Sequence, residues 1–405
     1  MMMALEQSVA TEFLSWQSCI DETIKNNSAL KSAYKSLESS QYSASGAYSG
    51  FFPQVTGSLD YSKNEGNTSD FQRNYSATIS ASETLFNGLQ DKAKVNQAAA
   101  QVRVQEANLT TFKAKVSFDL KSAYAGLLFA EQSFSLQQEI IKRREDNLKL
   151  VTLRFQGGRE NRGSMLLSKA YLNQANFDAL QAKNNIRVAQ AQLMNILGRD
   201  EDLELTVSEN VPLDASTSEP NFRQLMLSTP DHVQFIAQED VADSGITAAR
   251  AGFFPTLSLN ASTGKQGPDW FPQETHRTLG LTLSVPLFGG GKDYYATKSA
   301  VALFDVARST RENGDRQTLA KLKQTYTVYI EAIEKLKVDE SFKVAALKRA
   351  EIARSKYNNG LMTFEDWDLI ENDLIVRERT VLQSQQDLTT AEAAWQQAQG
   401  KGVIP

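Results

Sequence analysis

The chain has 405 residues, of which 41% are hydrophobic, and a formal net charge of −5 without any block of lysines and arginines. A nucleic-acid phosphate backbone requires such a block, so the composition excludes a nucleic-acid partner. Cys19 is the only cysteine, which excludes an intrachain disulfide and a cysteine-rich metal site, and we expect no metal and no other cofactor. A mean hydropathy of −0.39 favours long helices with a narrow buried stripe, or strands with one buried face, over a large globular core.

No window of the sequence approaches the ~18 apolar residues that a membrane-spanning helix requires. The first residues, Met1 to Leu5, lack the charged and apolar regions of a secretory signal. The sequence therefore predicts either a cytosolic protein or the mature or trimmed form of an exported one.

Along the chain, the first predicted helix (15–49) ends at the bend Gly50-Phe51-Phe52-Pro53, and the same four residues return at 252–255, an offset of 202 (252 − 50). Leu85-Phe86-Asn87-Gly88 returns at the same offset as Leu287-Phe288-Gly289-Gly290. The chain is therefore predicted to contain two tandem repeats, which is too long a period for a solenoid.

After each bend the sequence alternates between apolar and polar residues, which predicts β-hairpins at 51–87 and 253–288. Leu59 and Tyr61 fall on one face of a strand and Ser58 and Asp60 on the other. Strands of about 10 to 13 residues match the ~9 to 11 residues that cross a bilayer at a tilt. A soluble sandwich remains the alternative at this point, although its strands are usually nearer 5 to 6 residues.

A helix of about 70 residues is predicted at 88–157, because proline is absent and apolar residues recur with the 4-3 spacing of a coiled coil. The second repeat has its counterpart at 291–359. Shorter helices at 164–197 and 363–399 follow turns of a few residues and are expected to run back antiparallel. The predicted first repeat, 1–219, closes with an equatorial linker at 198–219, and the second repeat, 220–405, opens with a helix at 221–251.

These motifs together resemble the TolC-type outer-membrane efflux protein family. The residues that carry the resemblance are the paired Gly-Phe-Phe-Pro bends, Trp16-Gln17-Ser18-Cys19-Ile20, the strand exit Val285-Pro286-Leu287-Phe288 and Tyr357-Asn358-Asn359-Gly360-Leu361. The resemblance implies a mixed α/β membrane protein: a homotrimer whose four strands per chain close a barrel in outer-membrane lipid, continued by a helical tunnel across the periplasm of a Gram-negative bacterium. It also implies two partners, a periplasmic adaptor protein and an inner-membrane transporter.

Site residues follow from the same resemblance. It implies a constricting carboxylate six residues after the turn glycine, which is Asp366, with Tyr357 and Asp373 as further candidates for a periplasmic gate. The turns are expected to dock the adaptor through Gly157, Gly158, Arg159, Arg162, Asn359, Gly360 and Leu361, and the strand-to-helix bends are expected at Pro53, Pro255 and Pro286. The acidic cluster Asp366, Asp368, Glu371 and Asp373 could instead be a solvated helix face.

Catalytic residues are scarce, so no enzyme activity is predicted. His232 and His276 are far apart in the repeat scheme, and we expect both to be solvent-exposed or capping residues. A soluble trimeric coiled-coil scaffold without transport is the alternative function, and it would need no lipid-facing strands.

Overall fold

The computed structural model describes residues 12–65, 71–200, 204–207, 211–213 and 218–405. The chain divides into two compact units. The helical unit comprises Met1–Ala33, Thr110–Thr229 and Thr318–Pro405, and the sheet unit comprises Tyr34–Leu109 and Pro230–Gln317. Three helices contribute residues to both units: α2 (Ser28–Ala47), α3 (Gln90–Gln156) and α7 (Lys292–Asn358). The helices α3 and α7 have 67 residues each.

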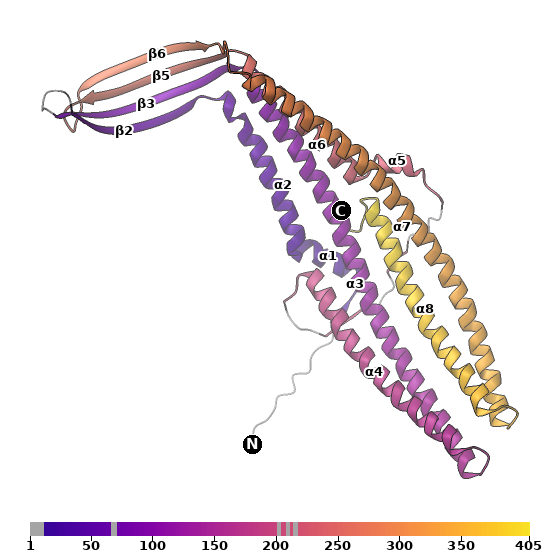
Figure 1. The fold of residues 1–405 in the computed structure, drawn as a ribbon. Helices are drawn as coiled ribbons and strands as arrows, with labels where there is room; N and C mark the ends of the chain where they lie inside the picture. The colour runs from indigo at the N-terminus through magenta and orange to yellow at the C-terminus, as the bar shows by residue number, and fades with distance from the viewer. Residues whose placement is uncertain (1–11, 66–70, 201–203, 208–210, 214–217) are drawn as a thin grey trace, which may run out of the picture. The chain divides into compact units, whose positions relative to one another are not determined.

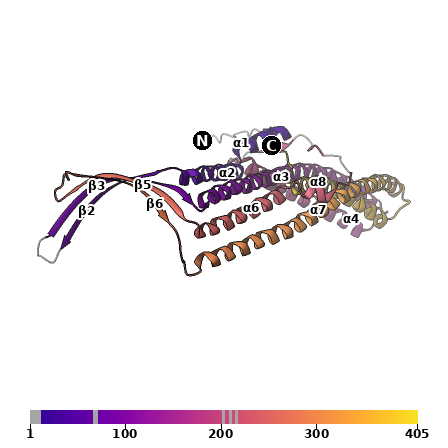
Figure 2. The same cartoon turned by 90° about the horizontal axis from the view of Figure 1, so that it is seen from above.

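The sheet unit contains four antiparallel strands in the order β2-β3-β5-β6 (Figures 1 and 2). Their bounds are β2 Gln54–Glu65, β3 Phe71–Asn87, β5 Thr256–Gly267 and β6 Glu274–Ser284. As the alternation predicts, apolar residues of paired strands share one face: Leu59 lies opposite Ala77, and Leu259 lies opposite Leu281. One face of the sheet is therefore apolar, and it is not covered by other elements, since Leu59 is 87% and Leu279 is 78% exposed.

Helices join the strands at the bends. The helix α2 leads through the short helix η1 (Tyr48–Phe51) to Pro53 and β2. In the same way, α6 (Pro230–Arg250) leads through η2 (Ala251–Phe253) to Pro255 and β5. Pro286 lies in the irregular segment between β6 and α7. Proline suits these positions because it cannot donate a ladder hydrogen bond.

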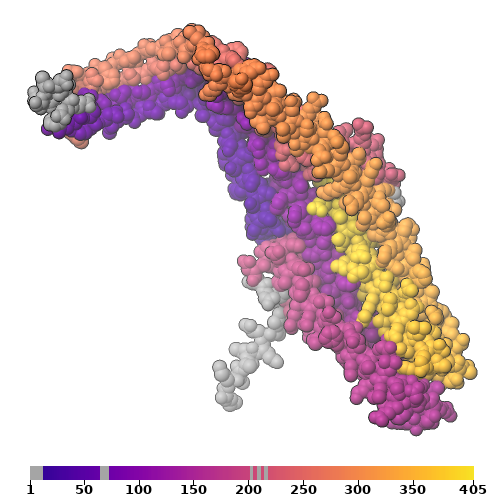
Figure 3. Space-filling view, viewed as in Figure 1, coloured from indigo at the N-terminus to yellow at the C-terminus, as the bar shows by residue number. Residues whose placement is uncertain are grey.

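In the helical unit, α4 (Arg162–Leu197) packs along α3, and α8 (Phe364–Ala398) packs along α7 (Figures 1 and 3). Leu322 and Tyr329 of α7 pack against Leu388 and Trp395 of α8, together with Met226 of the short helix α5 (Phe222–Met226). The apolar spacing predicted a coiled coil, and small residues such as Ala350 and Ala353 allow close packing along it.

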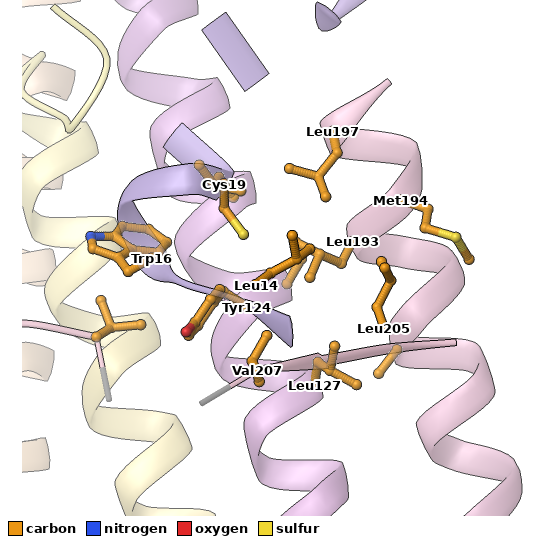
Figure 4. Close-up of a cluster of buried hydrophobic side chains, with 14 of the residues drawn as sticks. Leu14, Trp16, Cys19, Tyr124, Leu127, Leu193, Met194, Leu197, Leu205 and Val207 are labelled. Atoms are coloured by element: carbon orange, nitrogen blue, oxygen red, sulfur yellow. The ribbon is translucent and has the colours of Figure 1, made fainter. Parts of the chain in front are cut away.

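The largest apolar cluster of the helical unit lies where α1 (Trp16–Asn26) meets α3 and α4 (Figure 4). Trp16 packs edge-on against Tyr124 with ring centroids 5.2 Å apart, and Cys19 is fully buried. A two-stranded parallel sheet of β1 (Glu12–Leu14) and β4 (Leu205–Val207) closes this core with Leu14 and Leu205. β4 lies in the predicted linker, whereas sequence reasoning did not find β1.

Two predicted helices are interrupted, which corrects the prediction. The helix expected at 15–49 breaks at Asn27, whose side chain accepts a hydrogen bond from Leu30 N–H at 2.8 Å and so caps the start of α2. The helix expected at 221–251 breaks between α5 and α6, at Pro230, because proline cannot continue a hydrogen-bonded helix from the preceding turn. The long helices run through Gly126 and Gly314 without a break.

Within the described residues, the structure contains no helix that is both long enough and apolar enough to pass through a lipid bilayer.

Candidate functional site

Two turns that join the long helices to the return helices have the same backbone structure. Arg159 N–H donates to Arg154 C=O at 2.8 Å, and Leu361 N–H donates to Lys356 C=O at 2.9 Å. Gly158 and Gly360 have φ of +67° and +74°, which side chains other than glycine rarely adopt. Each following helix is capped by a side chain, Asn161 for α4 and Thr363 for α8. Glycine therefore fixes the chain reversal at both turns.

Tyr357, a predicted gate residue, is fully buried at the end of α7. Its ring stacks on Trp367 of α8 with centroids 4.3 Å apart and planes 12° apart. The Arg154 guanidinium lies over the same ring at 4.6 Å, and an Arg154 Nη atom donates to the Tyr357 carbonyl at 2.8 Å. The ring therefore contacts both an aromatic and a cationic side chain at close range. The end of α3 and the start of α8 thus hold Tyr357 between them.

The hydroxyl of Tyr357 donates a hydrogen bond of 2.9 Å to the carboxylate of Glu160, in the turn between α3 and α4. Burial, and then this carboxylate, raise the pKa of Tyr357 above its ordinary value, so the phenol keeps its proton. The contact joins the first turn to the end of α7. Sequence reasoning missed Glu160 and Arg154, because their roles depend on contacts with a residue about 200 positions away.

Asp366, the predicted constricting carboxylate, is exposed in the first turn of α8. Its backbone N–H donates to Thr363 Oγ1 at 3.1 Å, and the Thr363 hydroxyl donates to the Asp366 carboxylate at 2.9 Å. This reciprocal capping satisfies the helix end and orients the carboxylate.

Asp373 lies seven residues after Asp366, on the same face of α8. Leu369, between the two, is 66% exposed, and Val376, three residues after Asp373, is 56% exposed. Asp373 pairs with Arg377 at 3.3 Å and Arg349 at 3.7 Å. Seven residues are close to two turns, so the two carboxylates lie on the same face of the helix, with Asp366 exposed and Asp373 half-buried.

The other two acids of the cluster are not on a solvated face, which corrects that interpretation for them. Glu371 is 1% exposed and accepts from Arg354 at 3.0 Å. Asp368 is paired with Arg144 of α3 at 3.4 Å, and burial raises its pKa above the ordinary value. Asp366 and Asp368 therefore point away from each other, as their spacing of two residues requires.

The residues predicted to dock an adaptor lie at the two turns. Arg159, Arg162, Gly157 and Gly158 are exposed in the first turn, and Asn359, Gly360 and Leu361 are exposed in the second, with Leu361 75% exposed. The exposed side chains of Leu361, Arg159 and Arg162 offer both apolar and cationic contacts to a partner protein.

Neither histidine belongs to this site. His232 is buried in the sheet unit, where its Nδ1 lies 2.7 Å from an Asp315 carboxylate oxygen, so the expectation of an exposed or capping residue was wrong for it. His276 lies on the polar face of β6. Across the described ranges, no group of His, Cys, Asp and Glu side chains is placed to hold a metal ion.

Buried ion pairs join α3 to α8 away from the turns. Lys121 and Glu392 are 2.7 Å apart, with side chains 3% and 1% exposed, and Arg143 pairs with Glu378. Such pairs fix which faces meet, because displacing either helix would leave a charge buried without a partner. Sequence reasoning missed them because charged residues on a coiled-coil flank look like solvated positions.

The outer membrane efflux protein family model matches the chain twice, over residues 19–199 and 222–401. The chain belongs to this family. It is a family of efflux proteins rather than of enzymes.

Individual relatives of the chain are outer membrane efflux and secretion proteins. The chain is 22% identical to the outer membrane efflux protein BepC of Brucella suis over 69% of its own length and 63% of that protein. It is 24% identical to the alkaline protease secretion protein AprF of Pseudomonas aeruginosa over 66% of its length and 57% of that protein. The outer membrane protein TolC of Escherichia coli is 24% identical over 79% of the chain and 69% of TolC. The chain thus spans less than two thirds of the length of BepC and AprF.

Solved structures share the fold. A structure of CusC aligns with a TM-score of 0.85 at 16% identity, over 95% of this chain and 92% of that one. The outer membrane protein VceC of Vibrio cholerae aligns with a TM-score of 0.82 at 18% identity, over 96% of each chain.

Proposed function

We propose that the protein is a trimeric outer-membrane channel, the exit duct through which an efflux pump or a type I secretion system passes its cargo to the outside. The observation that carries this proposal is the uncovered apolar face of the sheet, on which Val55, Leu59, Ile79, Leu279, Leu281 and Leu283 are each at least 58% exposed. Large exposed apolar patches mark surfaces that bind protein or membrane. The proposed process, efflux or secretion, comes from the names of its relatives, which include efflux and protease secretion proteins.

Closure of the sheet requires further copies of the chain. Within the described residues, β2 and β6 each have a strand neighbour on one side only. An open edge in hydrocarbon leaves backbone groups unsatisfied, at a cost of several kcal/mol each. Three copies would pair β6 of one with β2 of the next and close a barrel of four strands per protomer in outer-membrane lipid.

Two tandem repeats build this protomer. The two matches of the family model support that arrangement, as does the offset of 202 between the starts of α3 and α7 (292 − 90). The boundary lies near residue 220, and the first repeat includes the linker 198–219.

The gate of the channel is formed at the turns in this proposal. Asp366 is exposed at the start of α8, so three copies around an axis would bring its carboxylates together and favour cations. Asp373, on the same face, is held by Arg349 and Arg377 and would line the gate as part of an ion-paired group. Tyr357 holds α8 against α3 and reaches Glu160, so it restrains the return helices. The exposed turn residues dock a periplasmic adaptor, which connects the duct to an inner-membrane transporter.

Oligomeric state and topology test the proposal together. The purified chain is expected to be a trimer in detergent, of three times 44.9 kDa. A cysteine at Gln266, at the hairpin end of β5, should react with an impermeant thiol reagent on intact cells, while one at Gly158 should not. The corresponding position in the first hairpin, Asn67, lies outside the described residues. Cys19 is buried, which keeps the background low.

A detergent-free monomer would contradict the barrel, and equal labelling of the two cysteines would contradict the span. A soluble trimeric scaffold would give the trimer without detergent dependence.

A further inference from the structure

Each of the four strands carries a single lysine or arginine: Lys63 on β2, Arg73 on β3, Lys265 on β5 and Arg277 on β6. The register places all four on the apolar face. Lys63 is opposite Arg73, Lys265 is opposite Ala77, and Arg277 is opposite Thr263, which in turn is opposite Ile79. All four residues are exposed. Charged residues on a lipid-facing surface are costly at mid-depth and are tolerated near the membrane surface.

The apolar residues on this face form a band that slants across the strands. Leu279, the last apolar residue of β6 before the hairpin end, is level with Val55 of β2 through Ala261 and Ala81. On β2, however, the band continues to Tyr61, six residues further (61 − 55). Strands that close into a barrel are tilted, so a membrane plane must cross them obliquely in this way.

The four cations follow the edge of the band nearest the hairpin ends. Arg277 is level with Gly57, whereas Lys63 lies six residues further along β2 (63 − 57), the same displacement as the edge of the band. Arg73 on β3 is level with Lys63, and Lys265 on β5 is level with Leu59, between Gly57 and Lys63. The four cations therefore occupy different register positions along the strands. Because the strands of a barrel are tilted, these positions fall at the same depth in the membrane.

Aromatic side chains lie at the same edge. Tyr61 and Tyr75 are in contact at 4.9 Å between ring centroids, and Tyr75 meets Trp270 at 5.5 Å. Tyrosine and tryptophan favour the level of lipid headgroups. Lys63 and Arg73 lie directly opposite each other on the same face, so two cations are concentrated at one point of this edge.

We propose that Lys63, Arg73, Lys265 and Arg277 form a basic row that binds the phosphate groups of anionic lipids in the leaflet at the hairpin ends. The inference rests on the proposed membrane location, which makes this face the lipid-facing one. Phosphate fits because the lysines supply point charges and the arginines a planar fork of donors. In three copies the row would continue around the barrel.

The test counts lipids bound to the purified protein. Protein in neutral detergent at low salt is mixed with equal amounts of phosphatidylglycerol and phosphatidylcholine, and native mass spectrometry reports how many of each remain bound. The wild type should prefer phosphatidylglycerol. The variant with Lys63→Gln, Arg73→Gln, Lys265→Gln and Arg277→Gln should lose that preference by at least tenfold, given about fivefold per cation.

Two controls separate charge at this edge from total charge. Lys183→Gln, Arg187→Gln, Lys321→Gln and Lys323→Gln remove four exposed cations from the helical unit and should keep the preference. Lys63→Arg with Lys265→Arg should also keep it. A quadruple sheet variant that retains the wild-type preference, or a wild type that binds both lipids equally, overturns the basic row. A wild type that binds neither lipid and stays soluble without detergent overturns the membrane location itself.

Discussion

The phenol of Tyr357 donates to the carboxylate of Glu160 at 2.9 Å, although the two residues lie 197 positions apart in the chain. Removing this hydrogen bond should loosen the turns without unfolding the helices. We expect Tyr357→Phe to raise single-channel conductance in a planar bilayer, because a hydrogen bond to a charged group contributes about 1.5–3 kcal/mol and the stacking on Trp367 is kept. Tyr294→Phe, which removes an exposed phenol from the same helix, should leave conductance unchanged. Equal effects of the two substitutions would show that the Glu160 contact restrains nothing.

Asp366→Asn should lower the cation preference of the channel while the Thr363 cap of α8 is kept, since asparagine still offers an oxygen to the threonine hydroxyl. Reversal potentials in asymmetric salt measure the preference. The difference between the wild type and Asp366→Asn should shrink as ionic strength rises, because salt screens the carboxylate charge over ~8–10 Å.

The best matched control is Glu365→Gln, which removes a neighbouring exposed charge from the same turn. Asp368 is a poor control because its removal leaves Arg144 half-paired in the core. If Glu365→Gln alters selectivity as much as Asp366→Asn does, the gate is not at Asp366.

Lys121→Met should be among the most destabilising single changes in the helical unit. It leaves the Glu392 carboxylate, 1% exposed, without its cation, and breaking one side of a buried pair costs about 3–5 kcal/mol. Circular dichroism melts in detergent should show a midpoint lowered by several degrees. The double variant Lys121→Met with Glu392→Gln should recover much of the loss. No recovery would mean that packing, rather than the unpaired charge, carries the effect.

Glu131 makes the stability of the helical unit depend on pH. Burial raises the pKa of Glu131 to about 7 from an ordinary 4.5, against the opposing effect of a hydrogen bond from Val207 N–H. Between these two pH values the folded state holds a proton that the unfolded state has released. The stability that protonated Glu131 contributes is therefore fully present below about pH 4.5 and is lost as pH rises through about 7. Because Glu131 is only half-buried, we expect about 1–2 kcal/mol after allowing for solvent screening.

Glu131→Gln should remove this fall in stability with rising pH, and it should raise the melting midpoint at pH 8 relative to the wild type. Glu139→Gln, an exposed position on the same helix, should change neither. A wild-type midpoint that does not fall between pH 5 and 7.5 more steeply than that of Glu131→Gln would contradict this assignment.

The sheet was largely predictable from the sequence because side-chain alternation has a period of two and one face must be apolar along its whole length. The alternation of Leu279, Leu281 and Leu283 excludes a register shifted by one residue, because such a shift would turn these side chains to the other face. The long helices were predictable for a similar reason, since the 4-3 spacing persists across many turns.

The short elements were not predictable in the same way. β1 has three residues, which is too few to show a period, and its partner β4 begins about 190 positions later, at Leu205. The break at Asn27 had a local signal, an asparagine directly before a serine in a capping position, but the surrounding apolar spacing outweighed it.

The contacts around the candidate gate could be predicted only in part. The family resemblance pointed to Tyr357 and Asp366, whereas the contacts of Glu160 and Arg154 with Tyr357 depend on how residues about 200 positions apart meet in space. The burial of Asp368 and Glu371 likewise depends on arginines from α3 and α7, which no local pattern of α8 reveals.

The most direct test of the membrane channel is the conductance of the purified protein in a planar lipid bilayer. The account predicts stepwise, cation-preferring currents carried by trimers, with larger steps from Tyr357→Phe than from the wild type. Trimers that insert into the bilayer and pass no current in either form would contradict it.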